Sequence, residues 1–384
     1  MAAYERIPYL IMFEDKSPFK ETYGGEIGRV VLKSHLLKPA GSSSDTVIVF
    51  MHPVGGGEYL PMPIALAKAG QHVIYCQSRY PNNDSALIME KVAIDMGACV
   101  RDARERLGYS KVVLAGWSGG GSLSLFYQSQ AEHATVRATP AGDPPDLTIQ
   151  EFIPADGVLL LAAHIGRAHT LTQWIDASIV DESRPEQRDP ELDIYNPENP
   201  NRPPYSVDFV ARYRAAQLAR NRRITAWVRE KLDHLRSGGR PNDEFGFVVH
   251  GTMADPKWLD PSIDPNGRKP NWCYLGDPQV VNNSPVGLAR FCTLRSWLSQ
   301  WSYDETRADG VRCAAGVSVP VLVLGNTADD ACTPAETMGL YHALPPGNKE
   351  LVEVEGANHY YFGQPELLQE AVRHCSDWLD KHGF

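Results

Sequence analysis

Short runs of apolar residues, each bounded by turn residues, recur along this sequence and are separated by segments with helical spacing. Near-continuous apolar runs are typical of strands that are buried on both faces of a parallel sheet. Residues 85–107, between two of these runs, place apolar side chains on one face of a helix. We therefore expect an α/β fold with a doubly wound, mostly parallel sheet. The expected strands are residues 29–37 (in an antiparallel N-terminal hairpin), 45–51, 72–77, 111–115, 157–163, 319–324 and 350–354.

The alternation of strands and helices stops in the middle of the chain. Proline-rich loops and one long helical segment, residues 207–235, occupy this part, and a short apolar run at residues 247–250 indicates a small strand. The alternation then resumes, with helices expected at residues 334–343 and 365–381. A core that is interrupted by an inserted, mainly helical cap domain accounts for this pattern. The predicted boundaries are residues 1–165 for the first part of the core, 166–312 for the cap and 313–384 for the second part of the core.

A candidate nucleophile lies between an expected strand and an expected helix. The sequence Gly-Trp-Ser-Gly-Gly, centred on Ser118, follows the apolar run at residues 111–115 and precedes a helix-compatible segment. A strained strand-to-helix turn of this kind exposes the serine hydroxyl, and the positions two before and two after it leave no room for a Cβ atom. Gly116 and Gly120 occupy those positions. The lysine-containing pattern of a phosphate-binding loop is absent from the sequence. We therefore predict that Ser118 is a nucleophile.

A histidine and two aspartates lie where the partners of such a serine are expected, each after a later strand. His359 follows the last apolar run and precedes the C-terminal helix, so its imidazole is a candidate general base. Asp329 and Asp330 follow the preceding apolar run, and either carboxylate could orient the imidazole. We expect the other aspartate to cap the next helix.

An oxyanion hole needs two backbone N–H groups beside the nucleophile. One is expected from Gly119, directly after the serine and at the start of a helix whose dipole favours an anion. The other is expected from the glycine-rich loop His-Pro-Val-Gly-Gly-Gly, residues 52–57. Pro53 has no N–H group, so we predict Val54 as the second donor, with Gly55 behind it.

Composition narrows the classes of partner. A net charge of −10 and a pI of about 5.7 disfavour nucleic acid. Seven widely spread cysteines without a C-x-x-C pair predict neither a disulfide framework nor a metal site. The N-terminus has no apolar signal region, and no apolar stretch is long enough to span a membrane. We therefore expect a cytoplasmic protein without a membrane partner, and the sequence leaves its oligomeric state open.

Four motifs together carry a resemblance to a known superfamily. They are His52-Pro-Val-Gly-Gly, Gly-Trp-Ser118-Gly-Gly, Thr-Ala-Asp329 and Ala-Asn-His359. In their order and flanking strands they resemble the α/β-hydrolase superfamily over residues 29–165 and 313–384. The resemblance implies that Asp329 is the acid of the triad. The chain departs from the common family pattern at Pro53, where glycine is usual, and at Gly325-Asn326, where His-Gly is common.

The resemblance also implies an activity. Members of the superfamily with a serine nucleophile work through an acyl-enzyme, without a metal or an organic cofactor. We expect a hydrolase that cleaves a carboxylic ester or a lactone of a small to medium, partly apolar molecule. The alternatives are a hydrolase that cleaves the C–C bond of ring-cleavage products with the same triad, and a non-catalytic ligand-binding receptor on the same fold.

Three sets of residues in or near the expected cap allow two interpretations each. Trp297 and Trp301, at i, i+4 spacing, line an aromatic substrate pocket or form the packing core of the cap. The arginines of residues 207–235 bind a substrate carboxylate or form a solvated basic face. His164 and His169 face the cleft or have structural roles.

Overall fold

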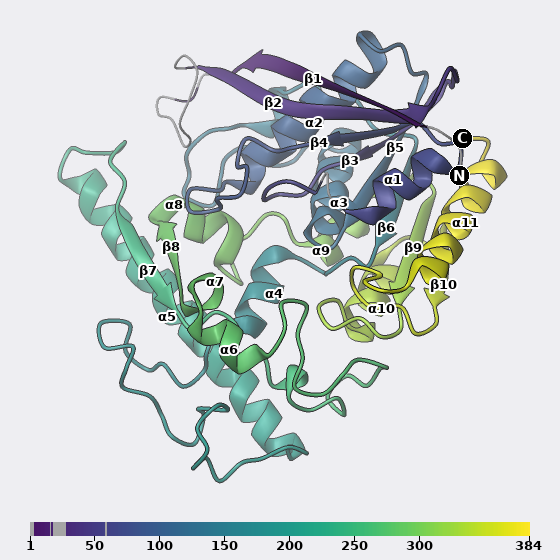
Figure 1. The fold of residues 1–384 in the computed structure, drawn as a ribbon. Helices are drawn as coiled ribbons and strands as arrows, with labels where there is room; N and C mark the ends of the chain where they lie inside the picture. The colour runs from purple at the N-terminus through teal and green to yellow at the C-terminus, as the bar shows by residue number, and fades with distance from the viewer. Residues whose placement is uncertain (1–3, 16, 18–27, 58–59) are drawn as a thin grey trace.

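One eight-stranded sheet organises the protein, in the order β1-β2-β4-β3-β5-β6-β9-β10 (Figure 1). The computed structural model describes residues 4–15, 17, 28–57 and 60–384. Strand β2 pairs antiparallel with β1 and β4, and the other neighbours in the sheet are parallel. The predicted fold class, a doubly wound and mostly parallel sheet, is therefore confirmed. The strands are β1 Tyr4–Glu14, β2 Arg29–Pro39, β3 Thr46–Phe50, β4 Val73–Cys76, β5 Lys111–Trp117, β6 Gly157–Leu161, β9 Val321–Asn326 and β10 Lys349–Val354.

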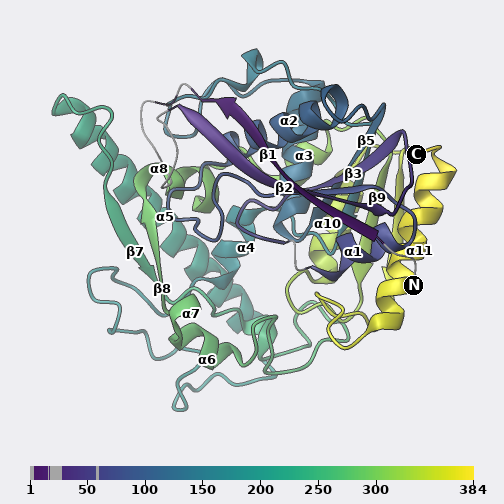
Figure 2. The ribbon, with the colours of Figure 1, turned by 45° about the horizontal axis from the view of Figure 1, so that its top comes forward.

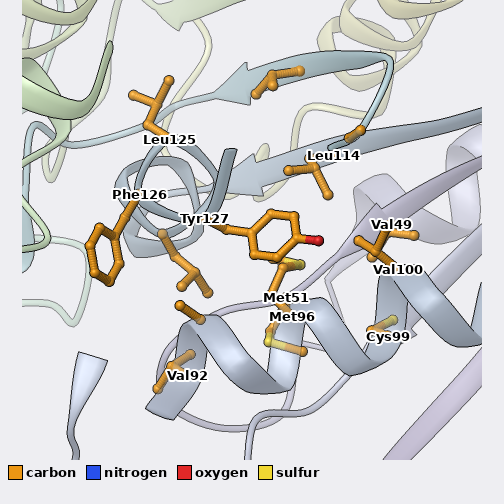
Figure 3. Close-up of a cluster of buried hydrophobic side chains, with 14 of the residues drawn as sticks. Val49, Met51, Val92, Met96, Cys99, Val100, Leu114, Leu125, Phe126 and Tyr127 are labelled. Carbon is orange, nitrogen blue, oxygen red and sulfur yellow. The ribbon is translucent and has the colours of Figure 1, made fainter. Parts of the chain in front are cut away.

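The central strands are apolar throughout because both faces of the sheet are covered. In and just after β3, Val47, Val49 and Met51 belong to one hydrophobic cluster, whereas Ile48 and Phe50 belong to a second. Successive side chains of a strand point to opposite faces, so each cluster lies on one side of the sheet. Figure 3 shows part of the first cluster, where α2 and α3 pack against the strands.

Helices cover the two faces in two groups, as Figure 2 shows. The first face carries α2 Met89–Glu105, α3 Gly119–Glu132, α9 Gly310–Ala314 and α10 Pro334–Ala343, and the second carries α1 Pro61–Lys68 and α11 Pro365–Lys381. The helices expected at residues 334–343 and 365–381 have the predicted bounds. The helix expected from residue 85 begins at Met89. Strand β1 was not specified in advance, although residues 9–13 form an apolar run, and as an edge strand it is largely exposed.

The sheet is interrupted between two neighbouring parallel strands, β6 and β9. We call residues 162–320 the inserted segment; it is described throughout and contributes no strand to the eight-stranded sheet. Its two strands form a separate antiparallel pair, which lies with the long helix α5 away from the main sheet (Figure 1). The elements of the segment before α9 are α4 Arg167–Trp174, α5 Val207–Ser237, β7 Gly246–His250, η2 Pro256–Trp258, α6 Pro278–Asn283, α7 Pro285–Leu288, β8 Ala289–Thr293, α8 Leu294–Ser296 and η3 Trp297–Trp301. A short helix of the core, η1, spans Leu147–Ile149.

The inserted segment has a hydrophobic core of its own. Trp297 and Trp301 are stacked, with ring centroids 5.5 Å apart, and both are buried against Ile224 and Val228 of α5. Of the two interpretations of these tryptophans, the structure supports the packing core. The two tryptophans lie on the π-helical turn η3. The α-helix that the i, i+4 spacing assumes is therefore not the local structure here.

Helix α5 carries seven arginines, which do not form a free basic face. Six of them lie within ion-pair distance of a carboxylate of the inserted segment, and Arg220 is buried. The seventh, Arg236, lies 3.3 Å from a carboxylate oxygen of Asp143. The six pairs within the segment are Arg212–Glu191, Arg214–Asp255, Arg220–Glu182, Arg222–Asp304, Arg223–Glu182 and Arg229–Glu305. These pairs join α5 to the long loops of the segment. Within the described residues, no helix combines the length and apolar character needed to cross a membrane.

Candidate active site

Ser118 lies at a sharp turn between β5 and α3. Its backbone has a φ angle of 50°, a left-handed conformation that is unfavourable for a residue with a Cβ atom. Three main-chain hydrogen bonds hold the turn. The Ser118 N–H donates to the Leu161 carbonyl (3.2 Å), and the Ser118 carbonyl accepts from the N–H groups of Gly121 (3.1 Å) and His164 (3.3 Å). The serine is half-buried, whereas its neighbours in the turn are buried. The turn therefore presents the Ser118 side chain at the carboxyl end of β5.

The glycines predicted to flank the nucleophile are required by close packing. A Cβ atom on Gly116 would lie 2.4 Å from the Gly120 carbonyl oxygen and 2.4 Å from the Gly121 Cα. A Cβ atom on Gly120 would lie 2.6 Å from the Met51 carbonyl oxygen. Backbone atoms cannot move aside as a flexible side chain can, so only glycine fits at either position.

His359 and Asp329 form a buried pair. The His359 Nδ1 atom lies 2.9 Å from Asp329 Oδ2, and the two residues are 2% and 0% exposed. The other carboxylate oxygen of Asp329 accepts hydrogen bonds from the N–H groups of Ala331 (2.7 Å) and Cys332 (2.8 Å). The structure thus places Asp329 against the imidazole. Asp330, the alternative acid, is not hydrogen-bonded to the imidazole, and its Oδ1 atom has no partner among the described residues.

The pKa of His359 is raised above its usual value of 6.5. Burial is the largest single influence and lowers it, but the charge and hydrogen bond of Asp329, with smaller contributions from Asp330 and Glu336, outweigh the burial. A carboxylate beside an imidazole stabilises the imidazolium form. The pair is therefore suited to hold a proton that His359 takes from another group.

Contacts between residues next to Ser118 and the His359 pair show that Ser118 and His359 lie near each other. Trp117 packs its indole against the His359 imidazole, with ring centroids 5.9 Å apart. The Cys332 thiol, a ring nitrogen of His359 and a carboxylate oxygen of Asp329 all lie within 4.8 Å of one another. The Ser118 side chain is near enough to influence the pKa of the same thiol. The Ser118 hydroxyl lies within hydrogen-bonding reach of the Cys332 thiol, and it turns about a single χ1 bond. Nucleophile–base contacts of this kind are often loose before substrate binds.

The loop that carries the aspartate is held by the inserted segment. We call residues 327–333 the acid loop. Its carbonyls at Asp329 and Asp330 accept hydrogen bonds from the side chains of Asn266 (2.7 Å) and Trp258 (2.7 Å), and the next carbonyl is 3.4 Å from the Lys257 ammonium. The backbone adds a bond from the Gly267 N–H to the Thr327 carbonyl (2.8 Å). Side chains from a distant part of the sequence thus fix the backbone beside the triad acid.

The expectation that the second aspartate caps the following helix is wrong. Helix α10 is capped by Thr333, which forms a capping box with Glu336. Threonine followed three residues later by glutamate is the usual sequence of this motif. The signal was therefore present in the sequence at Thr333 and Glu336.

The predicted oxyanion donors lie beside two histidines, the half-buried His52 and the buried His164. A Cβ atom on Gly119 would lie 2.7 Å from His52 Nε2 and 3.1 Å from His164 Nε2, so both imidazoles border this backbone position. Burial lowers the pKa of His52 to about 4 and that of His164 well below 6.5, so both rings are neutral at neutral pH. Of the two histidines expected either to face the cleft or to have structural roles, His164 therefore faces the site. His169 instead packs against Tyr303 and lies 3.8 Å from Asp309.

The Val54 N–H group lies against the His52 ring. His52 Nδ1 is 2.8 Å from the Val54 carbonyl oxygen and 3.2 Å from the Val54 nitrogen. A single ring nitrogen of a neutral histidine cannot donate and accept at once. The shorter contact assigns the proton to Nδ1, which donates to the Val54 carbonyl. The Val54 N–H group then has no acceptor in His52.

One cluster of side chains has the donor types of a metal site, namely Asp329, Cys332 and His359. Two of the atoms that could bind a metal, His359 Nδ1 and Asp329 Oδ2, are already hydrogen-bonded to each other. Burial, with Asp329 and Glu336 nearby, raises the pKa of the Cys332 thiol well above 9.0, so the thiol stays protonated. A metal ion binds the thiolate rather than the thiol. The prediction that no metal or cofactor is needed stays a prediction.

The strand order and the nucleophile turn after β5 define the α/β-hydrolase fold, so the resemblance inferred from the sequence is confirmed at the level of the fold. No family model matches the chain, and no curated protein matches it in sequence.

The chain is also similar to solved structures along most of its length. The chain is similar to a monoacylglycerol lipase from Paleococcus ferrophilus, with 18% identity, a TM-score of 0.44 and coverage of 88% of this chain and 94% of that one. It is similar to the esterase domain of a Rhodothermus marinus protein, with 11% identity, a TM-score of 0.47 and coverage of 98% of each chain. An alpha/beta fold family hydrolase from Bacillus anthracis str. Sterne has 15% identity, a TM-score of 0.41 and coverage of 90% of this chain and 95% of that one. These likenesses concern the fold alone.

Proposed function

We propose that this protein is a serine hydrolase that cleaves a carboxylic ester or a lactone of a small to medium, partly apolar substrate. The observation that carries the proposal is the buried His359–Asp329 pair, with its 2.9 Å contact, beside the strained turn that presents Ser118. A base whose pKa is raised by an orienting carboxylate, together with a serine hydroxyl that the turn presents, is the arrangement that acyl transfer requires.

The chemistry proceeds in two halves. Ser118 Oγ attacks the substrate carbonyl while His359 takes the hydroxyl proton, and Asp329 stabilises the imidazolium that forms. The N–H groups of Gly119 and Val54 donate hydrogen bonds to the oxyanion. His359 then protonates the leaving alkoxide, which leaves an acyl group on Ser118. In the second half His359 activates a water molecule, which releases the acid and restores the serine.

The test combines a substrate panel with covalent labelling. Wild-type protein and the Ser118→Ala variant are assayed with esters, lactones, thioesters and amides of matched acyl groups. We expect the ester or lactone to be the best substrate, and the variant to lose roughly a factor of 10⁴ or more in kcat. A fluorophosphonate probe should label the wild type and leave the variant unlabelled. Circular dichroism of both proteins checks that the substitution leaves the fold unchanged.

Two other outcomes would change the assignment. Turnover of a vinylogous diketone together with inactivity on simple esters would favour C–C bond hydrolysis by the same triad. Failure of the wild type to react with the fluorophosphonate, together with inactivity on the whole panel, would favour a non-catalytic ligand-binding protein.

A further inference from the structure

A cavity of about 930 Å³ lies beside the His359 imidazole. Its walls come from residues 267–275 of the inserted segment and, in the core, from residues 328–330 and 356–364. A space of this size holds a whole small molecule. Because His359 forms part of its wall, an occupant of the cavity lies next to the candidate catalytic base.

Aromatic side chains line this cavity from both sides. Tyr360 lies edge-on to the His359 ring, with centroids 4.7 Å apart, and Tyr274 approaches the same ring from the inserted segment at 6.2 Å. Further out, Trp272 is 42% exposed and Phe362 is 88% exposed. Large apolar side chains that remain exposed around one hollow indicate a binding surface. Flat aromatic walls favour an aromatic ring as the occupant.

The cavity also contains a polar group without a partner. Asp330 is 7% exposed and lines the cavity, and its buried Oδ1 atom has no hydrogen-bond partner among the described residues. Arg268, which also lines the cavity, is already engaged: its guanidinium donates to the main-chain carbonyls of Lys257 (3.0 Å) and Asp264 (2.8 Å) and to others nearby. A buried carboxyl in such a position is completed by a donor from outside the protein.

We propose that this cavity binds the leaving-alcohol part of the ester, and that this alcohol carries an aromatic ring with a hydroxyl or amine that donates to Asp330. The inference rests on the proposed function, because His359 can protonate the leaving oxygen only if the alcohol part lies against the imidazole. The ring packs between Trp272 and Tyr360, and its polar substituent reaches the carboxyl. Trp272 and Asp330 are thus specificity-determining residues.

Three esters that differ only in the alcohol test the proposal. They are the acetates of ethanol, 2-phenylethanol and 2-(4-hydroxyphenyl)ethanol. In each alcohol the ester oxygen is bonded to a primary carbon, and in the two aromatic ones two carbons separate it from the ring, so the leaving oxygens have similar reactivity. We expect kcat/KM to rise along this series, by roughly tenfold for the ring and roughly tenfold again for the hydroxyl.

Two variants separate the contributions of the ring and the hydroxyl. Trp272→Ala should remove most of the advantage of the phenylethyl ester over the ethyl ester. Asp330→Asn should reduce the ratio of the hydroxyphenyl to the phenyl ester. Phe245→Ala is the control, because Phe245 is similarly exposed (46%) and lies in the inserted segment outside the cavity. It should keep both ratios at their wild-type values.

A binding measurement distinguishes failure of this inference from failure of the proposed function. Calorimetry with the free alcohol 2-(4-hydroxyphenyl)ethanol needs no hydrolysis, and it should give equal affinity for the wild type and Ser118→Ala and weaker binding to Trp272→Ala. Hydrolysis of all three esters at equal kcat/KM, with no binding of the alcohol, would overturn the inference and leave the hydrolase intact. Binding of the alcohol to a protein that hydrolyses no ester would overturn the proposed function, and with it the leaving-group role of the cavity.

Discussion

The nucleophile turn and the acid loop meet at one site, but they are built in opposite ways. The turn around Ser118 is held by backbone hydrogen bonds and by glycines that pack against the core backbone. The acid loop, residues 327–333, depends on the side chains of Trp258 and Asn266, which come from the inserted segment. The first arrangement rests on close packing of main-chain atoms, whereas the second depends on two side chains that are 63 and 72 residues away from their acceptors in sequence.

The difference has a consequence for the role of the inserted segment. A cap that only covered the substrate could move without disturbing the triad. Here the segment holds the carbonyls that flank the candidate acid, so its position and that of Asp329 are coupled. We therefore expect substitutions in the turn to affect folding as well as rate, and substitutions in the contacts of the acid loop to affect rate alone.

The largest effect is expected at the nucleophile turn. Gly116→Ala places a Cβ atom 2.4 Å from the Gly120 carbonyl oxygen, so the strand and helix must separate. We expect a loss of about 3 kcal/mol in the free energy of unfolding, together with loss of fluorophosphonate labelling. Urea unfolding measures the first and gel fluorescence the second. Gly339→Ala is the matched control: its Cβ would meet only Ile165 Cγ2 at 3.5 Å, and it lies within α10. Wild-type stability in Gly116→Ala would show that the turn is not sterically fixed.

The second effect is expected at the triad acid itself. Asp329→Asn keeps the size of the side chain but removes the charge that stabilises the His359 imidazolium. By the energetics of triads in general, we expect kcat/KM for an ester to fall roughly 10³- to 10⁴-fold, with little change in stability. Steady-state kinetics and a thermal melt measure the two quantities. Asp330→Asn, which removes the neighbouring carboxyl that does not contact the imidazole, should cost much less with ethyl acetate. Equal losses in both variants would contradict the assignment of the acid.

Much of the core and the candidate triad could be predicted because their signals are local. The central strands are buried on both faces and therefore consist of continuous apolar residues, and the flanking glycines mark the turn at Ser118. Strand β1 was not specified even though residues 9–13 form an apolar run, and most of its side chains stay exposed at the edge of the sheet. The choice between Asp329 and Asp330 came from the family resemblance, and the hydrogen bond to His359 places Asp329 against the base.

The contributions of the inserted segment could not be predicted because they depend on distant contacts. Nothing in the sequence around Trp258 or Asn266 indicates that these side chains reach the acid loop. The tryptophans considered for either a pocket or the packing core, Trp297 and Trp301, are buried, whereas Trp272 lines the cavity. Burial decides between a packing tryptophan and a binding one, and burial inside an irregular segment follows from its tertiary packing.

A smaller effect is expected from the contacts that hold the acid loop. Asn266→Ala together with Trp258→Phe removes the side-chain hydrogen bonds to the carbonyls of Asp329 and Asp330. We expect kcat for ethyl acetate to fall about tenfold, since small displacements of catalytic groups slow the reaction strongly, with KM nearly unchanged. Asn201→Ala is the control, because Asn201 donates to the Glu191 carbonyl within the inserted segment. A rise in KM without a change in kcat would show that these residues bind substrate instead of positioning the acid.

The smallest expected effect is a shift in the pH profile, which tests directly whether the inserted segment holds Asp329 against His359. His359 acts as a base only when neutral, so kcat/KM must fall as the pH drops through the pKa of this residue. Because Asp329 raises that pKa, the midpoint of the acid limb should lie above 6.5 in the wild type. If the inserted segment holds Asp329 in place, the Asn266→Ala, Trp258→Phe variant should weaken the pair and move the midpoint to lower pH. A loss of roughly 0.5 kcal/mol corresponds to a shift of about 0.4 pH unit, which a profile from pH 5 to 9 resolves. Asn201→Ala should keep the wild-type midpoint. A variant that loses rate but keeps the midpoint would show that the contacts of Asn266 and Trp258 do not hold Asp329 against His359. The proposed coupling between the inserted segment and the triad acid would then be wrong.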